Sequence, residues 1–311
     1  MSDTPPVLLL AFNRPAQIRR VLDRVREARP MRLYVHVDGP RPGRPEEARL
    51  VEAVREVIYN GVDWDCRLET WFRDANAGLQ QGVSEAITWF FEQEPWGIVL
   101  EDDCLPDPTF FPFAGELLRR FENDERIMHI GGSNLIEDQT RLLPASYVYS
   151  RFSFIWGWAS WRRAWRHYAS DLDGLEAFAR SSAFESFLPD AMSRCYMLDK
   201  FRATRRRLNQ TWDYAWFYTI LKNDGWCIVP VVNLVENTGI GDAQATHTQG
   251  ADASARLRAQ SISIPVVHPE NQMIDQRLEQ QFFFATQKRR FRLWLWYLLY
   301  RLGMRGVRTE K

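Results

Sequence analysis

Residues 97–103 read Gly-Ile-Val-Leu-Glu-Asp-Asp, an apolar run that ends in three consecutive acids. Short continuous apolar runs are typical of buried strands, so the run predicts one. Adjacent carboxylates repel each other unless solvent or a cation relieves them. Mg²⁺ and Mn²⁺ prefer oxygen ligands and share protein carboxylates with substrate phosphates. The stretch therefore favours a divalent-metal site with Asp103 as the direct ligand; the alternative is a solvated loop or helix cap leading into Pro106.

The chain before this stretch alternates apolar runs with segments of helical period. Strand-like runs occur at Val7–Phe12, Leu33–Val37, Leu68–Phe72 and Gly97–Leu100. Amphipathic helix patterns separate them at Pro15–Val25, Glu46–Ile58 and Leu79–Phe90, and a helix at Phe110–Phe121 and a strand at His129–Asn134 follow. This order predicts an α/β fold with a Rossmann-like, mostly parallel central sheet flanked by helices. In such sheets ligands gather beyond the carboxyl ends of the strands, where the acidic run lies.

Composition narrows the class of protein. Of 311 residues, 45% are apolar and 14% aromatic, which suffices for one sizeable core. The 40 basic and 40 acidic residues cancel, so no nucleic-acid partner is expected. The cysteines, Cys66, Cys104, Cys195 and Cys227, form no CxxC pair, which favours a reducing compartment over a zinc or disulfide framework. The N-terminus lacks the basic flank and length of a signal peptide, so we expect the protein in the cytoplasm.

Four motifs carry a family resemblance. In chain order they are Ala11-Phe12-Asn13-Arg14-Pro15, Val37-Asp38-Gly39-Pro40, Arg73-Asp74-Ala75-Asn76-Ala77-Gly78-Leu79 and Leu100-Glu101-Asp102-Asp103. Together they resemble the nucleotide-binding half of a GT-A glycosyltransferase, in particular the bacterial family-2-like transferases. A more distant similarity is to the Golgi N-acetylglucosaminyltransferase that initiates complex N-glycans, which also has a Glu-Asp-Asp turn. The resemblance extends from Val7 to about Thr248.

The resemblance implies a domain organisation and a reaction. It implies a GT-A domain over 1–270, with a nucleotide-binding half at 1–134 and an acceptor-binding half at 135–270, followed by a tail at 271–311. The implied activity is metal-dependent transfer of a sugar from a nucleotide-diphosphate donor, with a UDP-sugar favoured, to a hydroxyl of a glycan or lipid-linked acceptor. The implied cofactor is Mn²⁺ or Mg²⁺, and the implied process is synthesis of bacterial surface polysaccharide or glycolipid.

The resemblance also assigns the nucleotide-sugar pocket. Its residues are Ala11, Phe12, Asn13, Arg14, Asp38, Arg73, Asn76, Gly78 and Asp102. Asp38 would contact the base or the ribose. For three of these residues an ordinary structural role is the alternative: Asn13 as a helix cap, Gly78 as a turn residue and Asp38 as part of a Gly-Pro turn.

Transfer with inversion needs a carboxylate that takes a proton from the attacking hydroxyl. Asp213 is the candidate base, because Trp212-Asp213-Tyr214-Ala215-Trp216 is similar to the Trp-Asp-Asp-Trp segment that carries the base in the Golgi enzyme. Tyr214 replaces the second acid of that segment. The alternative is an acid that stabilises the positive end of a helix dipole, and retention of stereochemistry stays open.

Two further segments are candidates for binding. Trp156, Gly157 and Trp158, together with Trp212, predict a platform for a sugar or acceptor, with core packing as the alternative. The polar, glycine-rich segment 237–248 ends in Thr-His-Thr, and the resemblance implies that His247 completes the metal shell. The alternative for a lone histidine is a surface or structural residue.

The tail alternates arginines with Trp, Tyr and Leu from Lys288 to Arg308 and is too short to span a bilayer. It suits an anionic membrane surface, which would place the protein on the inner face of the cell membrane; a helix docked on the domain is the alternative.

Two other functions compete with the transferase. A sugar nucleotidyltransferase is disfavoured because no glycine precedes Gly39, and the aromatic clusters leave a non-catalytic carbohydrate-binding or membrane-scaffold protein open.

Overall fold

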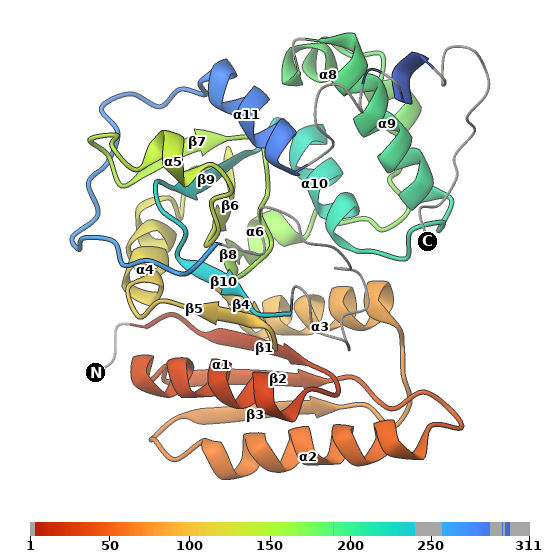
Figure 1. Cartoon of the computed structure of the whole chain (residues 1–311), viewed down its shortest axis with the longest axis vertical. Coiled ribbons are helices and arrows are strands. Elements are labelled where there is room, and N and C mark those ends of the chain that lie inside the picture. Colours follow the sequence, from red (N-terminus) through yellow and green to blue (C-terminus); the bar gives the residue numbers. More distant parts are fainter. Residues whose placement is uncertain (1–3, 189, 240–256, 287–293, 295, 299–311) are drawn as a thin grey trace.

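A computed structural model of the chain describes residues 4–188, 190–239, 257–286, 294 and 296–298 (Figure 1). Within these residues, eight strands form one sheet in the order β3-β2-β1-β4-β8-β6-β9-β7. The strands are β1 (Val7–Ala11), β2 (Arg32–Val37), β3 (Arg67–Phe72), β4 (Trp96–Glu101), β6 (Ile127–Gly131), β7 (Tyr147–Ser150), β8 (Trp158–Trp161) and β9 (Trp226–Pro230). A separate two-stranded ribbon pairs β5 (Cys104–Pro106) with β10 (Val235–Asn237).

The sheet is mostly parallel. Strands β3, β2, β1 and β4 pair in parallel, and β6 and β9 also pair in parallel with each other. Strand β8 runs antiparallel to both β4 and β6, so these two strands share one direction, and β7 is antiparallel to β9. The predicted α/β architecture with a mostly parallel sheet is confirmed, and it is compatible with a Rossmann-like fold.

Helices cover both faces of the sheet. The helices among the described residues are α1 (Pro15–Ala28), α2 (Pro45–Gly61), α3 (Leu79–Gln93), α4 (Phe110–Arg120), α5 (Glu137–Thr140), α6 (Arg162–Trp165), α7 (Leu175–Phe178), α8 (Ser182–Phe187), α9 (Ala191–Arg205), α10 (Asp213–Lys222) and α11 (Gln276–Thr286). Successive residues of β1 point to opposite faces of the sheet, because side chains alternate in direction along a strand. Leu9 belongs to a core cluster with residues of α1, α2 and α4, whereas Leu8 belongs to another with residues of α3, α6 and α10.

The predicted helices and strands before residue 131 are confirmed. The N-cap position of α1 is Arg14, with Pro15 at the first helical position, so the helix-cap alternative for Asn13 is wrong. The Arg14 side chain does not cap the helix; it forms hydrogen bonds with Asp102 and Asp103 instead. Pro15 accounts for the start of the helix, because its missing N–H needs no partner there.

The second half of the chain completes the sheet and adds a helical layer. Strand β8 lies between β4 and β6, so residues before and after position 134 share one continuous sheet. Helices α8 to α11 gather in the upper half of Figure 1. Together with α7 they contribute to a second core cluster that contains Phe152, Phe187, Phe217 and Phe282.

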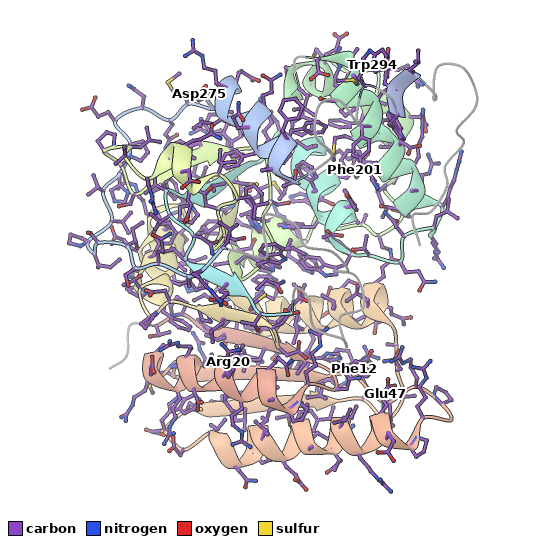
Figure 2. The ribbon with its side chains drawn as sticks, viewed as in Figure 1. Phe12, Arg20, Glu47, Phe201, Asp275 and Trp294 are labelled. Carbon is purple, nitrogen blue, oxygen red and sulfur yellow. The ribbon has the colours of Figure 1, made fainter. Side chains whose placement is uncertain are left out.

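The described part of the C-terminal tail lies against the helical layer. Trp296 is 8% exposed, and its ring meets the ring of Tyr196 edge to face at 5.2 Å. Trp294 is 52% exposed and lies in the upper half of the molecule, whereas Phe12 lies in the lower half (Figure 2). These contacts favour the docked-helix alternative for Trp296, and the basic segment before Trp294 lies outside the described residues. Among the described helices, none combines the length and apolar character needed to cross a membrane.

Candidate active site

The carboxyl ends of four parallel strands meet at one edge of the sheet. The backbone N–H of Asp38 donates to Ala11 O at 3.0 Å, and that of Arg73 donates to Val37 O at 3.0 Å. The N–H of Phe12 donates across to Asp102 Oδ2 at 3.3 Å. Residues that follow β1, β2, β3 and β4 therefore lie along one edge, as the strand order predicts.

The acidic turn after β4 is held by Arg14. The guanidinium donates to Asp103 Oδ2 at 2.8 Å and to Asp102 Oδ1 at 3.3 Å. Asp102 is 7% exposed, and Asp103 keeps more contact with solvent. Arg14 thus links the N-cap position of α1 to both carboxylates, which are 88 and 89 positions away in the sequence.

The turn carries more negative charge than Arg14 neutralises. Burial, and then the charge of Asp103, raise the pKa of Asp102 to about 7 despite Arg14. Burial also raises the pKa of Glu101 well above its usual value, and the charges of Asp103, Asp102 and Asp213 add to this effect. The Glu101 side chain keeps partial contact with solvent.

This donor set fits a divalent cation. Carboxylate oxygens are the ligands that Mg²⁺ and Mn²⁺ prefer, and the surplus negative charge at the turn would be neutralised by such an ion. Within the part of the chain that the structure describes, no group of three or more His, Cys, Asp or Glu side chains is arranged to hold a metal. The turn therefore suits an ion held by one or two carboxylates, with substrate phosphates supplying further ligands.

The β5–β10 ribbon brings a second segment onto the turn. The N–H and hydroxyl of Thr238 donate to Asp103 O at 2.8 and 3.1 Å. A Cβ on Gly239 would lie 3.0 Å from Asp103 Cγ, so the glycine backbone packs closely against this carboxylate. The polar, glycine-rich segment therefore begins at the acidic turn, and His247, the predicted second metal ligand, lies outside the described residues.

Helix α10 brings Asp213 near the same site. Asp213 stands in the first turn of the helix, and its Oδ1 accepts hydrogen bonds from the Thr211 hydroxyl and, at 2.9 Å, from Tyr214 N. Its charge raises the pKa of Glu101, so the two carboxylates share one electrostatic environment. The structure therefore brings the candidate base toward the acidic turn, while its bond to Tyr214 also agrees with the helix-dipole alternative.

Asp38 has a clear structural role. Its Oδ1 accepts from Gly39 N and Ala77 N, both at 2.9 Å, and its Oδ2 accepts from Asn76 Nδ2 at 2.9 Å. These bonds fasten the turn before α3 to the end of β2, and Gly78 closes this turn with a φ of +79°. A base or ribose contact of Asp38 stays a prediction, since a carboxylate has further acceptor positions.

Arg73 is engaged at the outer edge of the sheet. Its Nε donates to His36 Nε2 at 3.0 Å, it pairs with Glu85, and its guanidinium lies 4.3 Å from the centre of the Trp71 ring. These contacts direct Arg73 toward α3, and contact with a nucleotide sugar remains a prediction.

The tryptophans of the predicted platform divide into two groups. Trp158 and Trp212 are 0% and 2% exposed and stack on each other at 5.8 Å inside the aromatic core. Trp156 is partly exposed, and Gly157 adopts a φ of +63° where a Cβ would press against Val235. Core packing therefore describes Trp158 and Trp212, which offer no exposed ring face to a sugar in this structure.

Two contributors to this edge are not evident from the sequence. Glu101 is not among the residues that the resemblance assigns to the site, yet burial and the charges of Asp103, Asp102 and Asp213 raise its pKa. Gly239 could be noticed only as one glycine of a polar loop, because no local pattern shows that it meets Asp103. Compared with known protein families the chain matches none, and the comparison with curated proteins yields no match.

Proposed function

We propose that the chain is a metal-dependent glycosyltransferase with a GT-A fold, which moves a sugar from a nucleotide-diphosphate donor to a hydroxyl of a glycan or lipid-linked acceptor. The observation that supports this most is the acidic turn at the carboxyl edge of the sheet. There Asp102 and Asp103 share the Arg14 guanidinium, Glu101 precedes them in the turn, and Asp213 approaches from another helix. Mn²⁺ or Mg²⁺ is the proposed cofactor and a UDP-sugar the favoured donor.

Each residue has a role in the proposed reaction. A cation bound at Asp103 would neutralise charge on the leaving diphosphate. Arg14 would orient Asp102 and Asp103 and compensate part of their charge before the donor binds. Asp213 would accept the proton of the attacking hydroxyl, which gives inversion at the anomeric carbon.

Calorimetric titration of UDP in the presence and absence of Mn²⁺ tests donor binding, and hydrolysis of UDP-sugars tests turnover. We expect Asp103→Ala to abolish the metal-dependent part of UDP binding together with hydrolysis. Asp138→Ala, a change of the same type at an exposed site on α5, is the matched control and should behave as the native protein does. Metal-dependent binding that survives Asp103→Ala would refute this assignment of the ligand.

The base is tested separately, with a defined acceptor. Asp213→Asn keeps the size of the side chain, so donor binding should remain while transfer falls by about 10²- to 10⁴-fold. An unchanged transfer rate rules out Asp213 as the base, and the anomeric configuration of the product, read by NMR, distinguishes inversion from retention. Formation of a sugar nucleotide from a nucleoside triphosphate would instead favour a nucleotidyltransferase, and glycan binding with no turnover a binding protein.

Attachment to an anionic membrane through the tail is a separate part of the proposal. Trp294 and Leu298 are 52% and 40% exposed although Trp296 is docked, so apolar groups remain on the surface there. Truncation after Gln287 should reduce sedimentation with liposomes that contain phosphatidylglycerol. Equal sedimentation of the shortened chain would contradict the membrane role.

A further inference from the structure

An open groove of about 590 Å³ lies between the edge strand β3 and helix α3, away from the acidic turn. Its volume is within the range of about 300–1,000 Å³ that is typical of small-molecule sites. The lining residues come from three segments of the chain: Glu69, Thr70 and Trp71 from β3, then Ser84, Glu85, Thr88, Trp89 and Glu92 from α3, and Tyr168 from the loop after α6.

Three partly exposed aromatic side chains form the apolar part of the groove. The rings of Trp71 and Trp89 meet edge to face at 5.8 Å, and Trp89 contacts the buried ring of Tyr34 in the same way at 5.4 Å. Tyr168 stacks on Trp165 at 4.4 Å with an interplanar angle of 8°. These contacts hold the rings in place before a ligand arrives, which reduces the entropy lost on binding.

The polar lining consists of hydroxyls and carboxylates. Glu69 pairs with Arg67 at 2.7 Å, and Glu85 pairs with Arg73, so two of the acids are already compensated and act as hydrogen-bond acceptors. Glu92 is exposed, and the lining contains no lysine or arginine. An anionic ligand such as a nucleotide is therefore disfavoured here, because it would face carboxylates and the nearby Arg67 and Arg73 are already paired with two of them.

Aromatic faces beside uncharged and acidic acceptors match the chemistry of a neutral sugar chain. The apolar C–H faces of pyranose rings can pack on Trp and Tyr, while sugar hydroxyls can donate to Glu, Ser and Thr oxygens. A cationic ligand is less suited, since most of the acidic charge is paired and the Arg73 guanidinium already lies over Trp71.

The groove approaches the candidate base through Tyr168. Tyr168 stacks on Trp165, and the Trp165 ring meets at 6.3 Å the ring of Trp212, the residue before Asp213. Burial, and then the charge of Asp213, raise the pKa of the Tyr168 phenol, which agrees with this arrangement. The groove therefore adjoins the aromatic cluster next to the candidate base.

We propose that the groove between β3 and α3 binds a neutral oligosaccharide, on the rings of Trp71, Trp89 and Tyr168. Its identification as part of the acceptor rests on the proposed function, whereas the binding of the sugar chain does not. The bound segment lies outside the nucleotide-sugar pocket and leads its end toward Asp213.

Direct binding of defined sugars tests this site. Cellohexaose, maltohexaose and chitohexaose serve as probes, with saturation-transfer NMR and calorimetry as readouts. Binding of at least one probe should weaken by about tenfold or more, or about 1.4 kcal/mol, in Trp89→Ala. Ser84→Arg fills the groove from a partly exposed position on α3 and should cause a similar loss without removing a buried side chain. Tyr59→Ala, at a 59% exposed aromatic on α2, is the matched control and should bind as the native chain does.

The outcomes separate this site from the transferase proposal. Failure of all three probes to bind, or binding that both groove variants retain, overturns the groove as a saccharide site. Metal-dependent UDP binding is measured on the same variants and should not change, because the acidic turn is untouched. Loss of saccharide binding in the variants supports the groove as a saccharide site even if UDP-sugars are never hydrolysed. The absence of hydrolysis would refute only the assignment of the saccharide as the acceptor.

Discussion

Replacing Gly239 by alanine tests the geometry of the acidic turn without removing any functional side chain. Gly239 does not have a positive φ, so alanine is acceptable to the backbone and only the space for its Cβ is at issue. That Cβ would overlap Asp103 Oδ2, its nearest neighbour, and would lie 3.0 Å from Asp103 Cγ and 3.1 Å from Asp103 Cβ. Heavy atoms pack best at about 3.5–4.0 Å, so one of the two residues must move by about 1 Å or more.

The carboxylate is the part that we expect to move. Its backbone oxygen is fixed by two hydrogen bonds from Thr238, but the side chain can rotate away from Arg14, 2.8 Å from Oδ2. Misplacement of a reacting or ligating group by about 1 Å can reduce a rate by about 10²-fold. We therefore expect metal-dependent UDP-sugar turnover to fall by about 10- to 100-fold, which corresponds to about 1.4–2.8 kcal/mol.

The assay combines turnover with thermal unfolding and a double-mutant cycle. The melting temperature should change little, since no buried group is lost. If Gly239→Ala acts through the carboxylate, adding it to Asp103→Ala should cause no further loss of UDP binding. Additive losses in the double variant, or full activity in Gly239→Ala, would refute the proposed contact between the loop and the metal ligand.

Three further predictions concern stability. Burial raises the pKa of Glu279 from 4.5 to about 7, so the folded protein favours the protonated carboxyl. The contribution of this group to the free energy of unfolding is therefore complete below about pH 4.5 and is lost as the pH rises through about 7. Glu279→Gln should therefore flatten the pH dependence and raise the free energy of unfolding at pH 8 by at most about 3 kcal/mol, as measured by urea titration at several pH values. Asp38→Ala leaves the N–H groups of Gly39 and Ala77 without their acceptor and removes one of the two acceptors of Asn76 Nδ2, so it should cost about 2–3 kcal/mol in the same titration; a loss confined to UDP affinity would favour the ribose role. Trp158→Ala removes a fully buried ring and should cost about 3–5 kcal/mol in urea unfolding, whereas weaker acceptor binding at unchanged stability would restore the platform interpretation.

Local patterns were sufficient for the first half of the fold. The alternation of apolar runs with amphipathic segments predicted β1 to β4 and the helices between them, because burial on both faces of a parallel sheet requires continuous apolar strands. The same alternation placed the acidic turn at the carboxyl edge of the sheet. The insertion of β8 between β4 and β6, in the opposite direction, carries no local signal, since a strand's neighbours are chosen by packing across the whole sheet.

For the site, the sequence alone determined which residue types stand at the strand ends. The type of a side chain limits the chemistry that it can perform, so the sequence was enough to propose Asp103 as an oxygen ligand and Asp213 as a base. Only the tertiary structure decided which of them meet. It joined Arg14 to Asp102 and Asp103, brought Gly239 onto the same turn, and enclosed Trp158 in the core. The physical reason is that burial and charge coupling depend on distances in space, and residues far apart in the chain come together only when the fold buries its apolar surface.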